Sequence, residues 1–311
     1  MKRSNFLLTG AVVFALAFCF TSCSKDDDKD VKTTTQSQNG GNSSSSDNQT
    51  PTNNNGSSST DNNGSSSTDN NGSTLKVPED CIGGVFSVSA NKKVFFSKGN
   101  LQYDADNQKF MLAEHQWDFI GENGGNISST TGIRDLFGWG TWLEGANPML
   151  SSDNPSEYSW DETKKAVIGE DWYALSNDEW AYLINNRGTE KYGIASVNEV
   201  NGLVLLPDDF KLPEGVSFDP AVAKSNVDFK EINEFSSGDW SKMESAGAIF
   251  LPAANDRDVL DASGDGRSGN YWSSTPSDSD YAYYFEIAWW KPNVKNFRRC
   301  LGHSVRLVKV L

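Results

Sequence analysis

The last forty or so residues, 271–308, constrain the fold more than any other stretch of this chain. They begin with YWSST at 271–275, continue through the aromatic segment 281–290 and close with GHSVRLV at 302–308. In the aromatic segment large, mostly apolar residues occupy every second position, at Tyr283, Phe285, Ile287 and Trp289. The closing segment repeats this pattern at Val305 and Leu307. A period of two is typical of a half-buried strand. Three short strands joined by polar turns predict an antiparallel meander at this end of the chain.

The other end of the chain has the features of an export signal. A short basic start is followed by an almost unbroken apolar run over 6–20, which is too short to span a membrane and has the length of a signal-peptide core. Small residues and Cys23 follow, and this sequence resembles a bacterial lipobox. The resemblance implies a signal peptide over 1–22 and a lipid on Cys23 that would hold the protein on a membrane. The alternative is an ordinary secretory signal with an incidental cysteine.

An acidic run and a long polar segment come next. The run SKDDDKD at 24–30 resembles the surface-export signal of Bacteroidota lipoproteins, although a solvated charge run is the alternative. From 33 to 74 almost every residue is Ser, Thr, Asn, Gly or Asp. Because such a segment buries too little apolar surface to offset its ordering entropy, residues 23–78 are predicted to form a disordered tether. We therefore expect an outer-membrane lipoprotein that faces the cell exterior, with a periplasm-facing anchor as the alternative.

Residues 79–311 are predicted to form one folded domain. All ten tryptophans and all nine tyrosines lie there, and the length is sufficient for a sizeable core. The chain carries a formal net charge of −15, most of it in this domain. A domain this acidic is not expected to bind nucleic acid through bulk charge.

Several shorter segments predict strands and a buried cluster. Alternating or apolar runs predict strands at 85–89, 94–97, 101–103, 109–112 and 248–251. The sequence Val200-Asn201-Gly202-Leu203 predicts a hairpin with its turn at Asn201-Gly202. The glycine and aromatic residues of 136–142 predict a buried aromatic lock, with a ligand platform as the alternative.

Two helices are predicted between these strands. Ser176 and Glu179 have the spacing of a capping box, and an apolar stripe follows them until Gly188 ends the helix. A second, shorter helix is predicted over 240–245.

The end segments carry a resemblance to a known family. YWSST, an aromatic strand and then GxSVRLV resemble the end of the Fibrobacter-type major paralogous domain. That group is similar to the C-type-lectin-like fold and, more distantly, to the formylglycine-generating sulfatase-modifying enzymes. Over residues 81–308 the resemblance implies an α+β fold of the C-type-lectin-like kind, with twisted antiparallel sheets, a few short helices and long loops.

The resemblance also bears on the cysteines. The formylglycine-generating enzymes use two redox-active cysteines near the C-terminus, whereas this chain has only Cys300 in that region. Their activity is therefore not expected here. Since folds of this kind bring their terminal strands together, the resemblance makes a disulfide between Cys81 and Cys300 plausible in an oxidising compartment, with two separate thiols as the alternative.

The loop at 256–267 is the best candidate for a ligand site. It precedes Tyr271, where C-type-lectin-like domains place their long binding loop, and it contributes Asp256, Asp258, Asp261 and Asp265. The spacing matches the first half of a calcium loop, but a tryptophan stands where an EF-hand needs its glutamate. No metal or other cofactor is therefore predicted, and a weaker calcium site or a solvated turn remain open.

Two neighbouring tryptophans form the other candidate. Trp289 and Trp290 end the aromatic strand, where successive side chains point to opposite faces, so at least one ring is expected to be partly exposed. An exposed indole ring could stack on a sugar or a protein partner.

No catalytic motif stands out in the sequence. There are only two histidines, His115 and His303, and His303 is interpreted as a satisfied structural residue within the closing strand. We expect a non-catalytic surface module that binds an extracellular glycan or protein. A carbohydrate-active enzyme with carboxylates not identified here, or an accessory subunit of a surface assembly, are the alternatives.

Overall fold

The structure is a computed structural model. It describes 66–68, 74–121, 131–144, 165–220, 228–257, 262–263, 266–288 and 291–311. The predicted signal peptide, the lipidation site Cys23 and the acidic run lie outside the described residues.

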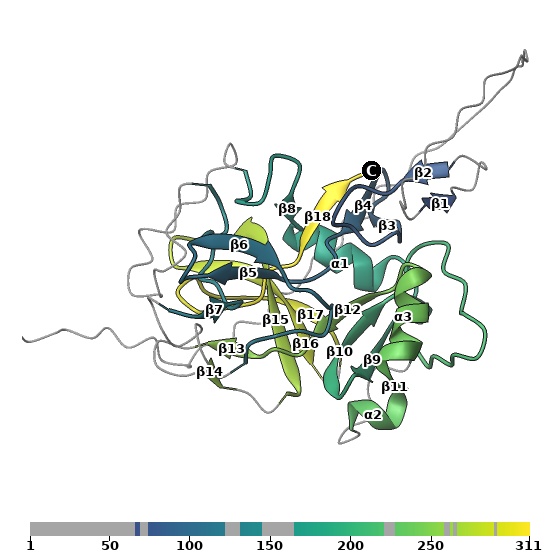
Figure 1. Cartoon of the computed structure of the whole chain (residues 1–311). Helices are drawn as coiled ribbons and strands as arrows, with labels where there is room; N and C mark the ends of the chain where they lie inside the picture. The colour runs from purple at the N-terminus through teal and green to yellow at the C-terminus, as the bar shows by residue number, and fades with distance from the viewer. Residues whose placement is uncertain are drawn as a thin grey trace, which may run out of the picture.

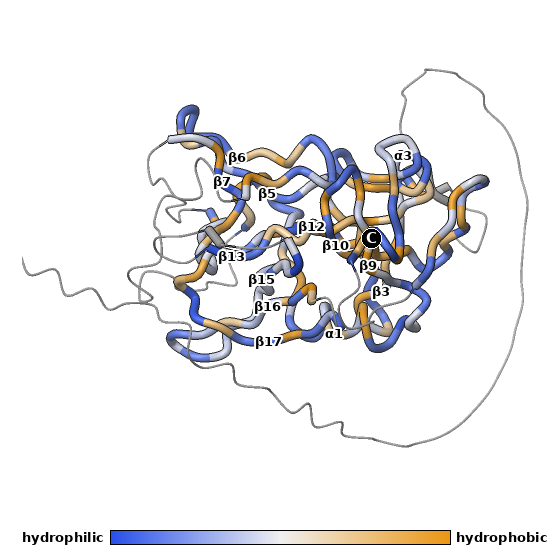
Figure 2. The backbone as a smooth tube through the Cα atoms, turned by 90° about the horizontal axis from the view of Figure 1, so that it is seen from below, coloured by the Kyte–Doolittle hydropathy of each residue, from blue (hydrophilic) through white to orange (hydrophobic). Residues whose placement is uncertain are grey.

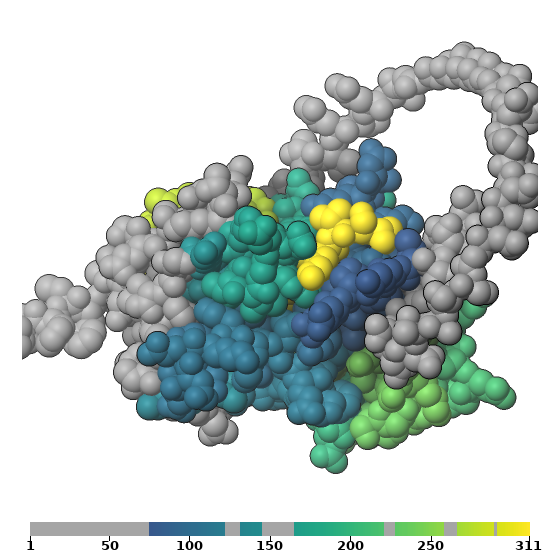
Figure 3. Space-filling model, turned by 45° about the horizontal axis from the view of Figure 1, so that its top comes forward, coloured from purple at the N-terminus to yellow at the C-terminus, as the bar shows by residue number. Residues whose placement is uncertain are grey.

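A four-stranded sheet joins the beginning and the end of the domain. Its strand order is β3–β4–β18–β8, and its members are β3 (Phe86–Ser89), β4 (Lys92–Phe96), β8 (Tyr173–Ala174) and β18 (Leu307–Val310). Val308 of β18 is paired with Phe96 of β4, so the last strand closes onto the first hairpin. Figure 3 shows the C-terminal strand wedged between the two segments that flank it.

A second four-stranded sheet carries two of the helices. Its order is β11–β9–β10–β12, with β9 (Tyr192–Val197), β10 (Val200–Leu205), β11 (Glu234–Phe235) and β12 (Ile249–Pro252). α2 (Phe229–Ile232) and α3 (Ser237–Ser245) lie beside it (Figure 1). Trp240 of α3 packs edge-on against Phe250 of β12 with ring centroids 5.5 Å apart. Figure 2 shows hydrophobic residues concentrated along β9 and β10.

The predicted hairpin at 200–203 exists, but its turn was placed wrongly. The turn consists of Asn198 and Glu199, which both have positive φ, as the two central residues of a type I′ turn require. Asn201 and Gly202 lie inside β10 instead. Gly202 is needed there because an added Cβ would lie 2.3 Å from the Leu251 carbonyl oxygen on β12.

The meander is formed by β15 (Ser268–Pro276), β16 (Tyr281–Ala288) and β17 (Asn293–Arg298). The prediction of an antiparallel meander is confirmed for β15 and β16, but its third strand is β17 rather than the closing segment. The closing segment runs beside β15, where Ser304 N–H donates to the Asn270 carbonyl oxygen at 2.9 Å. It then leaves the meander and becomes β18 of the terminal sheet.

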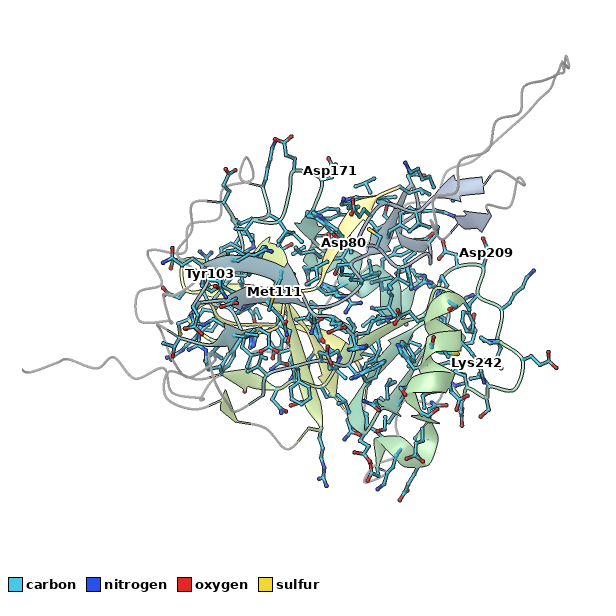
Figure 4. The ribbon with its side chains drawn as sticks, in the orientation of Figure 1. Asp80, Tyr103, Met111, Asp171, Asp209 and Lys242 are labelled. Carbon is cyan, nitrogen blue, oxygen red and sulfur yellow. The ribbon has the colours of Figure 1, made fainter. Side chains whose placement is uncertain are left out.

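Three smaller pairings complete the structure. They are β6–β5–β7, with β5 (Leu101–Asp104), β6 (Lys109–Leu112) and β7 (Ile133–Arg134); β13 (Asp256–Arg257) with β14 (Ala262–Ser263); and β1 (Ser66–Thr68) with β2 (Thr74–Lys76). The β1–β2 hairpin lies inside the segment that was predicted to form the tether. Figure 4 places Tyr103 and Met111 at the opposite end of the molecule from Lys242 of α3.

The capping-box prediction is confirmed. α1 (Asn177–Asn185) begins after Ser176, whose Oγ accepts from Glu179 N–H at 3.2 Å, while Ser176 N–H donates to Glu179 Oε2 at 2.8 Å. The buried face of α1 includes Trp180, whose ring stacks on Phe285 of β16 at 4.6 Å. α1 therefore packs against the face of the meander that also carries Tyr271 and Ile287.

The aromatic lock is also confirmed as a buried structural cluster. Trp139 Nε1 donates to the Ser273 carbonyl oxygen at 2.9 Å, and Trp272 Nε1 donates to the Phe137 carbonyl oxygen at 2.6 Å. Both indoles are fully buried. These reciprocal bonds fix the 136–142 segment against β15.

The predicted disulfide between Cys81 and Cys300 is wrong, because Cys81 is a free thiol. The backbone of Cys81 forms an isolated antiparallel β-bridge with Ser97 just after β4, whereas Cys300 lies two residues after the end of β17. The terminal strands do meet as expected, but the chain crosses from the meander to the terminal sheet only after Cys300. Burial raises the pKa of the Cys81 thiol to about 11.

Candidate binding site at the loop end of the meander

The two segments predicted to bind a ligand are the aspartate loop 256–267 and the tryptophan pair Trp289–Trp290. Both connect to the meander at the same end. Ser268, the first residue of β15, is paired with Ala288, the last residue of β16. Asn255 N–H donates to the Ser268 carbonyl oxygen at 3.0 Å. The aspartate loop therefore leaves and re-enters the sheet beside the point where Trp289 follows β16. We call this region, Asn255–Arg257 with Ser268 and Ala288, the loop end.

The described part of the predicted site is small. Asp256 is half-buried in β13 and is paired with Ser263 of β14. The loop therefore begins as a short hairpin whose two strands have two residues each. The remaining predicted ligand residues, Asp258, Asp261, Asp265, Trp289 and Trp290, lie outside the described residues.

Sequence reasoning missed the polar residues on the neighbouring face of the meander. Asn270 on β15, Glu286 on β16 and Asn293 on β17 are paired across the sheet. Lys295 Nζ lies 3.4 Å from Glu286 Oε2, and the two side chains are only 16% and 13% exposed. A polar residue inside the otherwise aromatic strand 281–290 was the available signal, because an ion pair this sheltered carries a desolvation cost.

His303 lies on the same face, as a neighbour of Trp272 and Tyr284. Its ring centroid is 4.1 Å from that of Trp272 and 4.9 Å from that of Tyr284. The residue is buried, as predicted, but it is not satisfied, because neither ring nitrogen has a hydrogen-bond partner. Burial lowers the pKa of His303 to about 3; the adjacent backbone of Gly302 acts in the opposite direction, and the charge of nearby Arg257 lowers the pKa further. The imidazole is therefore neutral at physiological pH.

Arg257 connects the aspartate loop to the closing segment. It is 2% exposed and its backbone pairs with Gly302, with each N–H donating to the other carbonyl oxygen. A Cβ on residue 302 would lie 2.9 Å from Arg257 Nε. Gly302 is therefore required for the Arg257 side chain to lie at the loop end.

A second buried polar group lies nearby, and we call it the Arg306 network. Arg306 donates through Nη2 to Gln116 Oε1 at 2.7 Å and through Nη1 to Asn100 Oδ1 at 3.4 Å. Asn100 Nδ2 donates to the Tyr271 hydroxyl at 3.2 Å, which donates to the Pro252 carbonyl oxygen at 2.9 Å. Burial lowers the pKa of Arg306 to about 10. The network joins the closing segment to β12 and β15.

Within the described residues, three buried polar atoms near the loop end have no hydrogen-bond partner. Asn270 Oδ1 and both nitrogens of His303 are buried hydrogen-bonding atoms without partners, and such atoms usually have a functional or structural explanation. A neutral imidazole with its pKa near 3 is a poor general base at neutral pH.

Metal and membrane sites can be assessed only for the described residues. Within them, no three His, Cys, Asp or Glu side chains come together as a metal site would require. The acidic residues of the proposed calcium loop lie mostly outside this part of the chain. None of the described helices has the length and apolar character that a bilayer span needs.

Comparison with known proteins adds no relative. No family model matches the chain, and searches of curated proteins and of solved structures found no match either.

Proposed function

We propose that this chain is an outer-membrane lipoprotein whose folded domain binds an extracellular glycan or protein at the loop end, without catalysing a reaction on it. In this proposal the lipid on Cys23 anchors the chain, the polar segment that follows spaces the domain from the membrane, and the domain has a C-type-lectin-like fold.

One observation carries the proposal. The aspartate loop and the tryptophan pair were predicted as ligand segments independently of each other. The loop ends just before Ser268 and the tryptophan pair follows Ala288, and these two residues are paired across the sheet. Carboxylates suit sugar hydroxyls and indole rings suit sugar faces, so the residue types of these two segments fit a glycan. The partnerless polar atoms of Asn270 and His303 lie on the adjoining face.

A glycan array with the mature chain, with and without a chelator, tests the proposal. We expect binding to a limited set of glycans, and loss of at least tenfold in affinity when Trp289 and Trp290 are both replaced by alanine. Asp171→Asn is the control, because Asp171 is exposed and far from β13 and β14 (Figure 4). If no glycan binds, a screen of extracellular proteins with the same variants decides between the two ligand classes; binding unchanged by the tryptophan variant contradicts a loop-end site.

The proposed location has its own test. Cys23→Ala should release the protein from the membrane fraction, and replacing Asp26, Asp27 and Asp28 by asparagine should leave it anchored but protected from added protease. A Cys23→Ala protein that resists a salt wash of the membranes contradicts lipid anchoring. Turnover of polysaccharides would favour the enzyme alternative, and co-purification with fixed partners would favour an accessory subunit.

A further inference from the structure

β17 is an edge strand of the meander. It pairs with β16 on one side only, in the order β15–β16–β17. In Figure 2 it runs along one margin of the molecule near α1. An edge strand presents backbone N–H and C=O groups that can pair with another chain. The outward groups of β17 can be identified from the hydrogen bonds of its neighbours.

The sheet register fixes which residues of β17 point outward. On β15, Trp272 N–H and the Asn270 carbonyl oxygen bond to Ser304 and so face away from β16. Their cross-strand partners on β16, Tyr284 and Glu286, therefore direct their backbone groups toward β17.

Those two residues of β16 are paired with Lys295 and Asn293. The intervening residues Val294, Asn296 and Arg298 therefore point their N–H and C=O groups to the open edge, because successive residues alternate in direction. Val294 N–H confirms this direction, since it donates to Asn293 Oδ1 at 2.9 Å instead of to β16.

Most of the outward groups are open. The Arg298 carbonyl oxygen accepts from Leu301 N–H at 3.1 Å. In the part of the chain that the structure describes, no hydrogen bond reaches the outward N–H or C=O of Asn296, the C=O of Val294 or the N–H of Arg298. An added strand centred on Asn296 would find these four groups in the spacing of a sheet edge.

The charge along this edge is unlike that of the rest of the domain. Residues 291–299 contain four basic residues and no acidic one, in a chain whose formal net charge is −15. Lys295 is paired with Glu286 and Arg299 is buried, so Lys291 and Arg298 carry the accessible charge. Lys291 is exposed, and Arg298 is half-exposed. Basic residues on an edge oppose pairing with a second copy of the same edge, while they attract an acidic strand.

We propose that the β17 edge binds an extended, acidic segment of another protein by β-strand addition, centred on Asn296. Backbone hydrogen bonds would supply affinity, and Lys291 and Arg298 would select for acidic side chains. A second copy of this chain is disfavoured, because both edges would then carry the same accessible basic residues, Lys291 and Arg298. This surface begins beside the loop end, since Lys291 follows Trp290, but its backbone groups lie on β17 and do not depend on the glycan or protein ligand proposed there.

The probe is a capped, fluorescein-labelled heptapeptide of alternating glutamate and valine, titrated with the mature full chain and followed by fluorescence anisotropy. We expect saturable binding that weakens with added salt and is at least tenfold tighter than for the matching lysine–valine peptide. Absence of saturable binding, or equal binding of the lysine peptide, overturns the proposal.

A pair of variants at Asn296 isolates the backbone contribution. Asn296→Pro removes the outward N–H and leaves the bonds to β16, because proline is tolerated where an edge N–H faces solvent. Asn296→Val keeps that N–H, and both variants lose the bond from Asn296 Nδ2 to Ser277 Oγ. We expect at least tenfold weaker peptide binding for the proline variant and less than a threefold change for the valine variant.

A modified peptide covers the case in which the proline variant fails to fold. The same glutamate–valine peptide with alternate backbone nitrogens methylated keeps its charge but cannot form a strand pair along its methylated edge. On the unmodified protein it should bind at least tenfold more weakly. Two peptides are needed, each methylated along one of the two edges of the peptide strand. If both bind as tightly as the unmethylated peptide, strand addition is overturned.

Discussion

Arg306 and His303 lie three residues apart in one buried segment, and their surroundings differ in kind. Both terminal nitrogens of Arg306 donate to side chains, those of Gln116 and Asn100, while its Nε has no partner among the described residues. Neither ring nitrogen of His303 has a partner. Both residues are almost fully buried, at 0% and 1% exposure, so access to water does not explain the contrast.

The difference separates a buried polar group whose side chains bond to one another from buried polar atoms near the loop end that have no partner in the described part of the chain. A well-connected polar network is costly to break, because each lost partner leaves a buried group without a hydrogen bond. Removing a polar atom that already lacks a hydrogen-bond partner should change the free energy of unfolding little. Proteins keep some such exceptions near functional sites. Those of Asn270 and His303 adjoin the loop end, whereas Trp180 Nε1 and Arg306 Nε lie elsewhere in the core.

The largest expected effect is the loss of Gln116 from the Arg306 network. Gln116 accepts from Arg306 Nη2 and Phe250 N–H, and donates to Glu244 Oε2 and the Ala248 carbonyl oxygen. Gln116→Leu leaves a buried guanidinium and a backbone N–H with lost partners. We expect the free energy of unfolding to fall by about 3–5 kcal/mol, measured by urea denaturation.

Gln102→Leu is the matched control. Gln102 is also buried, at 7% exposure, but its side chain has no hydrogen bond among the described residues, so we expect a change below about 1 kcal/mol. Equal destabilisation by the two glutamine variants would show that the Arg306 network is not the stabilising feature.

The Arg306 network also shows where sequence reasoning stops. Gln116 and Arg306 are 190 residues apart in the chain, and nothing in either local sequence indicates the other. The capping box at Ser176 and the strands β3 and β4 were predictable because their determinants are local.

β17 was missed for a related reason. Its sequence NVKNFR alternates weakly and contains mostly polar residues, whereas the closing segment has the stronger strand pattern and was assigned to the meander instead. The pattern identified a strand, but the choice of partner strand depends on contacts that are distant in sequence. For the loop end, the residue types were predictable and their convergence at Ser268 and Ala288 was not.

The next largest effect concerns His303 and pH. In the unfolded chain its pKa is near 6.5, and in the folded domain burial lowers it to about 3. Between these values the unfolded state takes up a proton that the folded state does not, so stability falls as pH falls. From pH 6.5 to pH 5 we expect this histidine to contribute a loss of about 1–2 kcal/mol, measured by urea denaturation at each pH.

Removing each histidine in turn sharpens the assignment. His303→Phe should flatten the pH dependence between pH 6.5 and pH 5. His115→Gln is the control, because His115 is exposed and is the only other histidine in the chain. An identical pH slope in the parent and the His303→Phe variant contradicts a buried, partnerless imidazole.

A smaller effect is expected at the outer edge of the Arg306 network. Tyr271→Phe removes a buried hydroxyl that accepts from Asn100 and donates to the Pro252 carbonyl oxygen. The cost should be about 1–2 kcal/mol, because two modest hydrogen bonds are lost and both partners stay buried. Tyr281→Phe is the control, since Tyr281 is only half-buried and no side-chain bond of its hydroxyl lies within the described residues. A thermal melt that ranks the two variants equally contradicts the network.

The smallest effect on stability is expected at Asn270, on the loop-end side of the comparison. Its Oδ1 is buried without a partner, so Asn270→Val removes an atom that already has no hydrogen bond, and valine favours a strand. We expect the free energy of unfolding to change by less than about 0.5 kcal/mol, in contrast to the Gln116→Leu variant. If the loop end binds the ligand, the same variant should weaken binding of the glycan or protein found in the screens by at least threefold while the melting temperature stays unchanged. A loss of stability as large as that of Gln116→Leu would mean that Asn270 belongs to the structural part of the domain and that the two regions do not differ as proposed.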